Sequence, residues 1–360
     1  MSGPFDLLLA GAGHAHLGVL RLWMSGQRPK GRIGLISPGP YAWYSGMLPG
    51  LLAGRYRAEQ CRIPLQALCT AADVELLEGQ VNELDPLARC VHLADGRQYA
   101  ATWLSLNLGS VPKVPQGSDT VLEVLPVKPF ETFLQGWQRW QKAPQALAIL
   151  GGGAAGVELA LALAPQVPEL TLLSSAQVLT GHPLALRKRA LRHLAEAGVR
   201  VVESIAVDSI HGDALVAGDR LVWCGARVIL ATGASALPWL GRSGLACDEQ
   251  GFVRVGKTLQ SLSHSHVFAA GDCASLSATP RSGVYAVRQG PVLAVNLSAA
   301  LSGQAMTPFQ PQRRSLALLA DGQGGALLSW SGMTAEGECL GRWKDRLDRR
   351  FIARHLGTQS

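Results

Sequence analysis

Short apolar runs that end at glycine recur along this chain, and each is followed by a stretch of helical length. Residues 146–150 read Ala-Leu-Ala-Ile-Leu and run into Gly151-Gly-Gly153-Ala-Ala-Gly156, after which Ala and Leu dominate through Leu163. An unbroken apolar run of this length predicts a strand buried on both faces. We therefore expect a strand, a tight turn and a helix, which together are the unit of a parallel sheet.

The N-terminal end of the chain repeats this pattern. Residues 5–10 are mostly apolar, Gly11-Ala-Gly13 follows, and we expect a helix over 17–24. His16 stands where the other motif has its third glycine. Further apolar runs predict strands over residues 32–36, 74–79, 89–93, 100–106, 169–173, 200–202, 221–222 and 228–232.

Each of the two units ends in a strand that is followed by a glycine, so the whole unit is repeated along the chain. The first closes before Gly109 and the second before Gly233. A third strand ends in Gly271-Asp272 and precedes a helix expected over 283–301. The pattern predicts an α/β fold with two Rossmann-like dinucleotide units.

Several other stretches predict helices with a polar face. Residues 185–198 form a basic helix, which is expected to be solvated on its charged side. A helix with Trp137 and Trp140 is expected to use both rings for packing. Near the C-terminus four apolar residues recur at helical spacing, with arginines largely around the rest: Leu340, Trp343, Leu347 and Phe351, and Arg342, Arg346, Arg349, Arg350 and Arg354.

The C-terminal helix leaves two interpretations open. A basic amphipathic helix can lie on an anionic bilayer. A terminal helix can equally dock on the body of the protein or form a dimer interface.

The glycines of the mid-chain motif are candidates for nucleotide binding. Gly151 allows a tight turn, Gly153 lets the backbone approach a pyrophosphate, and Gly156 lets helix and strand pack closely. The unpaired N–H groups of the helix N-terminus favour phosphate. The alternative is a glycine-rich turn in an ordinary βαβ unit, but the strand before and the helix after the motif are those that the nucleotide mechanism requires.

The N-terminal motif contains two histidines, His14 and His16. Two residues apart on a helix do not face the same way, so a metal pair is disfavoured. We favour a helix N-terminus near a phosphate, formed with Gly11 and Gly13. No catalytic residue and no metal ligand is predicted.

Two further segments carry candidate contacts to a cofactor. Residues 41–54 are aromatic and glycine-rich, and are either a packed surface loop or a loop against a flat ring, with Ser45, Gly46 and Met47 as contacts. Asp272 follows Gly271 at a strand end. Its carboxylate is either the acceptor for a sugar hydroxyl of a cofactor or a helix N-cap.

Composition and charge narrow the class of protein. The 360 residues are 48% hydrophobic and 16% charged, with 41 glycines and a net charge of +7. This indicates a folded α/β protein that favours anionic ligands, and no basic run with interleaved aromatics indicates nucleic acid. The seven cysteines form no Cys-x-x-Cys pair, so we expect a reducing cytoplasm. We expect no transmembrane segment.

With these residues in view, the chain resembles the pyridine nucleotide-disulfide oxidoreductase superfamily. Within it, the pattern is similar to the type II NADH dehydrogenase-like branch, and most similar to the flavoprotein module found alone or fused to selenide, water dikinases. The segments that carry this likeness are residues 44–50, 127–129, 283–290 and 343–348.

The resemblance implies two cofactors and a domain order. FAD is expected at Gly11 and Gly13 with Asp272 on its ribityl chain, and NAD(P)H at the second motif with Glu158 beside the nicotinamide or its ribose. The FAD-binding domain would be discontinuous, with the NAD(P)H domain inserted in it and a short C-terminal α+β segment after it. The expected ranges are 1–115 and 244–304 for FAD, 116–243 for NAD(P)H and 305–360 for the C-terminal segment.

Three departures from the superfamily bear on the electron acceptor. No Cys-x4-Cys pair follows the first helix, so disulfide reduction has no residues to carry it. Alignment on the quinone-reducing branch places Val284 and Arg288 where that branch has glutamines, and Gln289 one position further. Ser37 and Ser174 replace ribose-binding acids, so the choice between NADH and NADPH is not readable.

The sequence thus predicts an FAD-dependent NAD(P)H oxidoreductase with a small-molecule acceptor, most simply a quinone. The alternatives are a sulfide:quinone-type enzyme, which the scattered cysteines disfavour, and an electron-transfer or accessory flavoprotein linked to selenium metabolism. Peripheral contact with the inner face of the membrane and a homodimer are further expectations, both tied to the C-terminal helix.

Overall fold

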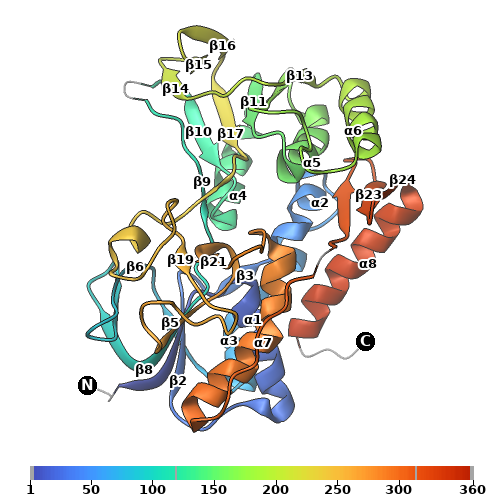
Figure 1. The fold of residues 1–360 in the computed structure, drawn as a ribbon. Coiled ribbons are helices and arrows are strands. Elements are labelled where there is room, and N and C mark those ends of the chain that lie inside the picture. Colours follow the sequence, from blue (N-terminus) through green and yellow to red (C-terminus); the bar gives the residue numbers. More distant parts are fainter. Residues whose placement is uncertain (1–3, 118–119, 313, 357–360) are drawn as a thin grey trace.

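The computed structural model describes residues 4–117, 120–312 and 314–356. Two parallel sheets form its two domains, with the inserted domain uppermost in Figure 1. The predicted α/β fold with two Rossmann-like units is confirmed.

The first domain is built on a seven-stranded sheet with the order β5-β2-β1-β8-β7-β6, in which β20 also pairs with β8. The strands β1, β2, β5, β8 and β20 run parallel. The helices α1 and α7 pack together on one face through glycines, because a Cβ at Gly18 would lie 3.2 Å from the Cα of Gly290. The bounds are β1 Phe5–Ala10, α1 His14–Leu22, β2 Ile33–Ser37, α3 Leu65–Ala71, β5 Glu75–Glu78, β6 Val81–Asp85, β7 Cys90–Leu93, β8 Gln98–Leu106, β20 Val267–Ala269 and α7 Gly283–Ser302.

The inserted domain is built on a five-stranded parallel sheet with the order β10-β17-β11-β12-β13. A three-stranded meander covers one face, and helices with Trp137 and Trp140 in their core cover the other. The bounds are β10 Glu123–Pro126, α4 Phe130–Trp140, β11 Leu147–Leu150, α5 Ala154–Leu163, β12 Leu170–Leu173, α6 Leu184–Glu196, β13 Arg200–Val202, β14 Ser209–His211, β15 Ala214–Ala217, β16 Arg220–Cys224 and β17 Arg227–Leu230.

Short pairings join and complete the domains. The two chain crossings between them pair as antiparallel strands β9 (Val111–Pro112) and β18 (Ala234–Ser235), each just after one of the closing glycines. A hairpin of β3 (Tyr41–Trp43) and β4 (Arg62–Pro64) holds the aromatic loop, within which lie the turns η2 (Ser45–Met47) and η3 (Ala58–Cys61) and the helix α2 (Leu48–Leu52). The strands β19 (Val253–Arg254) and β21 (Ala274–Ser275) pair with each other in parallel as a separate two-stranded sheet.

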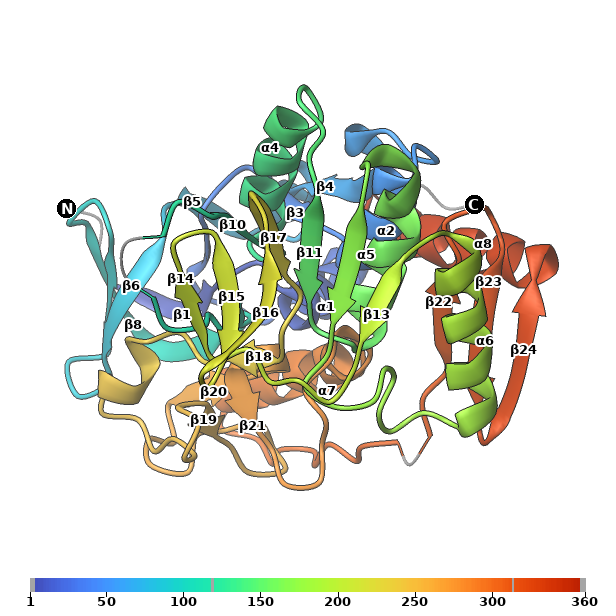
Figure 2. The same ribbon diagram turned by 90° about the horizontal axis from the view of Figure 1, so that it is seen from above.

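The C-terminal segment connects the two domains. Its strands β22 (Ala317–Ala320), β23 (Ala326–Trp330) and β24 (Met333–Gly337) form an antiparallel sheet that contacts α5 and α6 of the inserted domain. Its helix α8 (Glu338–His355) then descends to α1 of the first domain (Figure 1). Seen from above, α6, the three strands and α8 lie together on one side of the molecule (Figure 2).

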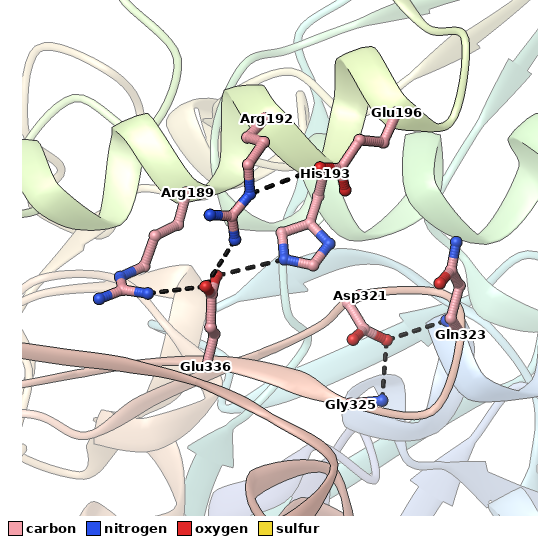
Figure 3. Close-up of polar contacts among 8 residues, drawn as sticks. All are labelled: Arg189, Arg192, His193, Glu196, Asp321, Gln323, Gly325 and Glu336. Carbon is pink, nitrogen blue, oxygen red and sulfur yellow. Dashed lines mark hydrogen bonds and ion pairs between the residues drawn. The ribbon is translucent and has the colours of Figure 1, made fainter.

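One carboxylate joins the C-terminal sheet to the inserted domain. Glu336 on β24 lies within 2.7 Å of Arg189 and 2.5 Å of Arg192, and 3.2 Å from His193 Nε2, all three on α6 (Figure 3). The neighbouring turn is closed by Asp321, whose Oδ1 accepts the N–H groups of residues 323–325. Figure 3 shows the bonds to Gln323 and Gly325. The Arg192 contact and those of its neighbours keep the pKa of Glu336 below its usual value.

Several predicted bounds are corrected by the structure. The first helix begins at His14 rather than Leu17, and ends at Leu22 in a π-type turn rather than at Met24. The strands β6, β10, β14 and β15 were not predicted at all. They are short edge or meander strands whose alternating side chains leave little continuous apolar signal.

Candidate active site

The two glycine turns lie at the carboxyl edges of the two sheets. In the first sheet Ala10 pairs with Leu106, which pairs with Ala269, so the residues that follow these strands gather at one edge. In the inserted sheet Leu150 and Pro126 both pair with Leu230. Ligands of open α/β sheets bind at such edges, where the strand order reverses.

The first turn is held by Asn107, which the sequence analysis did not single out. Gly11 adopts φ +91°, and the side-chain oxygen of Asn107 accepts the N–H groups of Ala15 at 3.0 Å and His16 at 3.2 Å. A Cβ at Gly13 would lie 2.3 Å from that oxygen. Glycine at position 13 is thus required by the packing of the turn. The N-terminus of α1 follows this turn, and a helix N-terminus favours phosphate.

His16 fills the position of the third glycine. It is fully buried, with Nδ1 2.6 Å from the carbonyl oxygen of Gly11 and Nε2 2.8 Å from the hydroxyl of Ser105. Burial lowers its pKa to about 4, so the ring is neutral. Because both ring nitrogens have partners inside the protein, His16 shapes the turn, and its contact with a cofactor stays a prediction.

The aromatic loop and α8 meet over the N-terminus of α1. The ring of Tyr44 stacks on Phe351 with 4.2 Å between centroids, and His14 lies 5.6 Å from both rings. Burial lowers the pKa of His14 to about 4. A Cβ at Gly46 would meet the Tyr44 ring at 2.8 Å, while Met47 is in the core and Ser45 begins η2.

Asp272 lies at the carboxyl edge of the first sheet and is not a helix N-cap. It accepts hydrogen bonds from Lys128 Nζ at 2.8 Å and from the Ser110 hydroxyl at 3.3 Å. The helix α7 begins at Gly283, and its N-cap residue is Ser282, ten positions after Asp272. The preceding Gly271 has φ +70°, and its N–H donates to the side-chain oxygen of Gln289.

The second turn shows how its three glycines differ. Gly151 has φ +126°, and a Cβ at Gly156 would lie 1.7 Å from the carbonyl oxygen of Gly151, so helix and turn touch there. A Cβ at Gly153 would meet nothing within 4 Å, and the same holds at Gly109 and Gly233. The backbone at these three glycines is therefore not packed against other atoms on the side where a Cβ would stand.

Glu158 on α5 faces the C-terminal segment. Its carboxylate accepts the N–H of Ala320 at 2.7 Å, and burial raises its pKa to about 7, opposed by the charge of Lys344. Lys344 on α8 donates to the carbonyl oxygen of Gly46 and to Asp348, both at 2.8 Å. The sequence analysis named residues 343–348 only as a family likeness; the structure places this lysine between the loop at Gly46 and Glu158 of α5.

The start of α7 carries the residues aligned with the glutamines of the quinone-reducing branch. Val284 is 41% exposed on the first turn, and Arg288 lies exposed one turn later. Gln289 is buried, and the turn at Gly271 uses it. Gln289 is therefore not available as a substitute for either glutamine.

The seven cysteines all lie within the described residues and are free. Cys61, Cys69 and Cys273 are fully buried, and burial raises the pKa of each thiol. A thiol of raised pKa is a poor nucleophile at neutral pH. The geometry thus offers no activated thiol pair at either nucleotide edge.

Comparison with known proteins decides the family. The model of the pyridine nucleotide-disulphide oxidoreductases matches residues 5–290. The chain belongs to this family. Its two nucleotides are accordingly FAD and NAD(P)H.

The relatives agree with the branch predicted from the sequence. Ferroptosis suppressor protein 1 of Taeniopygia guttata is 24% identical over 65% of this chain and 66% of its own length. Demethylphylloquinone reductase NdbB of Synechocystis is 27% identical over 53% of this chain and 50% of its own length. The chain thus matches between half and two thirds of these curated relatives, and the type II NADH dehydrogenase-like branch is confirmed.

Solved structures agree on the fold. The sulfide:quinone oxidoreductase of Aquifex aeolicus superposes with a TM-score of 0.80 at 16% identity, over 98% of this chain and 92% of that one. The water-forming NADH oxidase of Lactobacillus brevis gives 0.74 at 18% identity, over 91% and 75%. Both are two-nucleotide oxidoreductase folds.

Proposed function

We propose that this protein oxidises NAD(P)H through FAD and passes the electrons to a quinone. The balanced reaction is NAD(P)H plus a proton plus quinone, giving NAD(P)⁺ and quinol. The accessory role in selenium metabolism is not favoured by the relatives, of which one is a demethylphylloquinone reductase.

The position of Lys344 carries this proposal. It holds the loop of the expected FAD site through the carbonyl oxygen of Gly46, and its charge acts on Glu158 of the expected NAD(P)H motif. This lysine therefore brings the loop of one expected site close to the helix of the other, which supports nucleotides bound near each other, as hydride transfer requires.

Bound FAD would supply the acceptor for the hydride and the donor for the quinone. The residues of the protein would form the binding site around both nucleotides. Glycines 109, 153 and 233 leave room for the nucleotides, Asn107 and His16 fix the first turn, and the Tyr44 and Phe351 rings cover the start of α1. Glu158, which contacts the C-terminal segment at Ala320, can hold a proton near neutral pH.

The test is steady turnover by the purified protein alone. We expect a yellow protein that oxidises NADH or NADPH continuously when a soluble benzoquinone is added, with no second protein present. Stopped-flow reduction by each nucleotide identifies the preferred one. A flavin that NAD(P)H reduces, but that neither soluble nor isoprenoid quinones reoxidise, contradicts the acceptor and leaves the nucleotide half of the proposal intact.

The outer face of α8 supports a contact with anionic membranes. Its inner face is docked on the body through Gly341, Asp348, Ile352 and His355, so docking and membrane contact are not exclusive. The outer face exposes Trp343 at 41% and Leu347 at 40%, among arginines at positions 342, 346, 350 and 354. In the part of the chain that the structure describes, no helix is long and apolar enough to cross a membrane.

We predict that replacing both Trp343 and Leu347 by Ser weakens co-sedimentation with anionic vesicles. Burial of a large side chain in the interface contributes roughly 1.5–3 kcal/mol, so binding is expected to fall at least tenfold. The matched control is Leu221→Ser, an exposed leucine on the meander of the inserted domain. Equal sedimentation of the double variant and the control contradicts the membrane contact.

A homodimer stays a prediction, which analytical ultracentrifugation tests.

A further inference from the structure

An open cleft lies between the inserted domain and the C-terminal sheet, which are side by side at α6 (Figure 2). Its volume is about 550 Å³, the size of a small-molecule site. One wall is residues 181–183, where the loop from β12 to α6 ends, and the other wall comes from residues between 314 and 332. The polar side chains in the lining are His182, Arg314, Ser315, Ser329 and Ser331.

The loop that forms the first wall also touches the second glycine turn. The N–H of Leu179 donates to the carbonyl oxygen of Gly152 at 2.7 Å. In a Rossmann-like unit the adenosine ribose lies just beyond the second strand, which here is β12 and ends at Leu173. The cleft therefore borders the segment where the adenosine end of NAD(P)H is expected.

The N-terminus of α6 opens at this cleft through Pro183, its N-cap residue. Among the described residues no side chain caps the helix, and the N–H groups of Leu184 and Ala185 have no hydrogen-bond partner. The free N–H groups of a 13-residue helix carry partial positive charge and favour a phosphate group.

A buried hydroxyl provides separate evidence for a polar ligand. Ser329 on β23 is only 7% exposed and lines the cleft, and its hydroxyl has no hydrogen-bond partner in the part of the chain that the structure describes. Buried polar groups are almost always paired, and an unpaired one is costly. A ligand oxygen in the cleft would supply the missing partner.

The charge in this lining comes from Arg314. Its guanidinium group has five N–H donors. Its one hydrogen bond to the described residues goes to the Ser331 hydroxyl at 3.4 Å, so most of these donors are free for a ligand. Burial lowers the pKa of His182, so that ring is neutral at pH 7.

We propose that this cleft receives the 2′-phosphate of NADPH and that Arg314 selects NADPH over NADH. The inference rests on the proposed function in that the inserted domain binds NAD(P)H. An acid after the second strand would bind the ribose hydroxyl of NADH, whereas an arginine nearby accommodates the extra phosphate. Ser174 and Ser175 supply neither group, and the C-terminal segment brings in the arginine.

The experiment uses two nucleotides that differ in one group. 2′,5′-ADP carries the phosphate that distinguishes NADPH, and 5′-AMP lacks it. Calorimetry measures the binding of both to the FAD-loaded full chain, as wild type, Arg314→Gln and Arg314→Lys. The matched control is Arg220→Gln, because Arg220 is an exposed arginine on the meander and no ion pair of its guanidinium group is described.

We expect the wild type to bind 2′,5′-ADP about tenfold more tightly than 5′-AMP, because an arginine and a phosphate form charge-assisted, often bidentate hydrogen bonds. Arg314→Gln should lose this difference with its affinity for 5′-AMP unchanged. Arg314→Lys keeps the charge without the planar fork and should retain part of it. Stopped-flow reduction should show the same loss as a higher NADPH requirement at an unchanged limiting rate.

Four results overturn the inference. They are equal binding of the two nucleotides by the wild type, preferred reduction by NADH, an Arg314→Gln protein that keeps the difference, and a control that loses it equally. Inorganic phosphate is titrated as well, and binding that depends on Arg314 without a preference for 2′,5′-ADP indicates a free-anion site, which also overturns it. A wild-type flavin that neither NADPH nor NADH reduces contradicts the proposed function instead.

Discussion

At the scale of single residues, buried polar side chains serve the backbone of the turns. Asn107, His16 and Gln289 all bind main-chain groups next to the glycines, and each is almost fully buried. A buried backbone group without a partner costs about 1–3 kcal/mol. These residues thus hold the turns in place through their bonds to the main chain.

Glu158 gives a pH-dependent prediction. Its pKa is raised from 4.5 to about 7, so between these values the folded protein binds a proton that the unfolded chain has lost. The stability of the wild type should therefore fall as pH rises from 5 to 8, relative to Glu158→Gln. Glutamine still accepts the N–H of Ala320. Lys344, whose charge lowers the pKa, and Asp348, whose charge raises it, are the other charges that face the carboxylate.

The measurement is the thermal midpoint of both proteins across this pH range. We expect the difference between them to shift in favour of the variant by an amount worth roughly 1–3 kcal/mol at pH 8. A pH-independent difference would mean that Glu158 is ionised throughout.

At the scale of elements, the second glycine turn gives a contrast between two positions. Gly153→Val places its side chain in open space, so the fold and the bound FAD should be retained while NAD(P)H reduces the flavin much more slowly. Gly156→Ala places a Cβ against the carbonyl oxygen of Gly151 and should destabilise the inserted domain by roughly 1–3 kcal/mol.

Stopped-flow reduction and thermal unfolding separate the two effects. Slow reduction without loss of stability is expected for Gly153→Val, and loss of stability for Gly156→Ala. If Gly153→Val loses FAD as readily as it loses reduction by NAD(P)H, the two nucleotide sites are wrongly assigned.

The helix α8 shows how one element serves two surfaces. Lys344 and Phe351 on its inner face hold the loop at Gly46 and Tyr44. Its outer face is exposed and carries arginines at positions 342, 346, 350 and 354. The predicted apolar series is therefore divided: Phe351 packs against Tyr44, whereas Trp343 and Leu347 point to solvent.

At the scale of the whole molecule, the C-terminal segment joins both domains (Figure 1). Its Glu336 binds α6 of the inserted domain (Figure 3), and its helix α8 contacts α1 of the first domain. No thiol is among the contacts by which Glu336 binds α6. We predict that a protein without cysteines, with Ala at the buried positions and Ser elsewhere, still reduces quinones with NAD(P)H. The cost in stability is of the order of 1 kcal/mol per buried position.

Turnover and flavin content of the cysteine-free protein are the measurements. The informative adverse result is a folded, flavin-loaded variant that NAD(P)H reduces but that cannot pass electrons on. That result would restore a thiol relay of the disulfide or sulfide type.

The sequence by itself determined the two strand–glycine–helix units, their order and the family. These features are local: a buried parallel strand requires a continuous apolar run, and a nucleotide turn requires glycines at fixed spacing. The runs at residues 5–10 and 146–150 satisfy both requirements, so the fold class and both motifs were predictable without any knowledge of distant contacts.

Only the tertiary structure decided which side chains, distant in the sequence, meet where the two domains and the C-terminal segment contact one another. Lys128 follows β10, an edge strand of four residues that no apolar pattern marks, and its partner Asp272 is 144 positions away. Asn107 and Lys344 likewise act on backbone groups more than 90 positions distant. Periodicity reports which face of an element is apolar, whereas these contacts depend on how two sheets and a terminal helix are oriented in space, which no local pattern encodes.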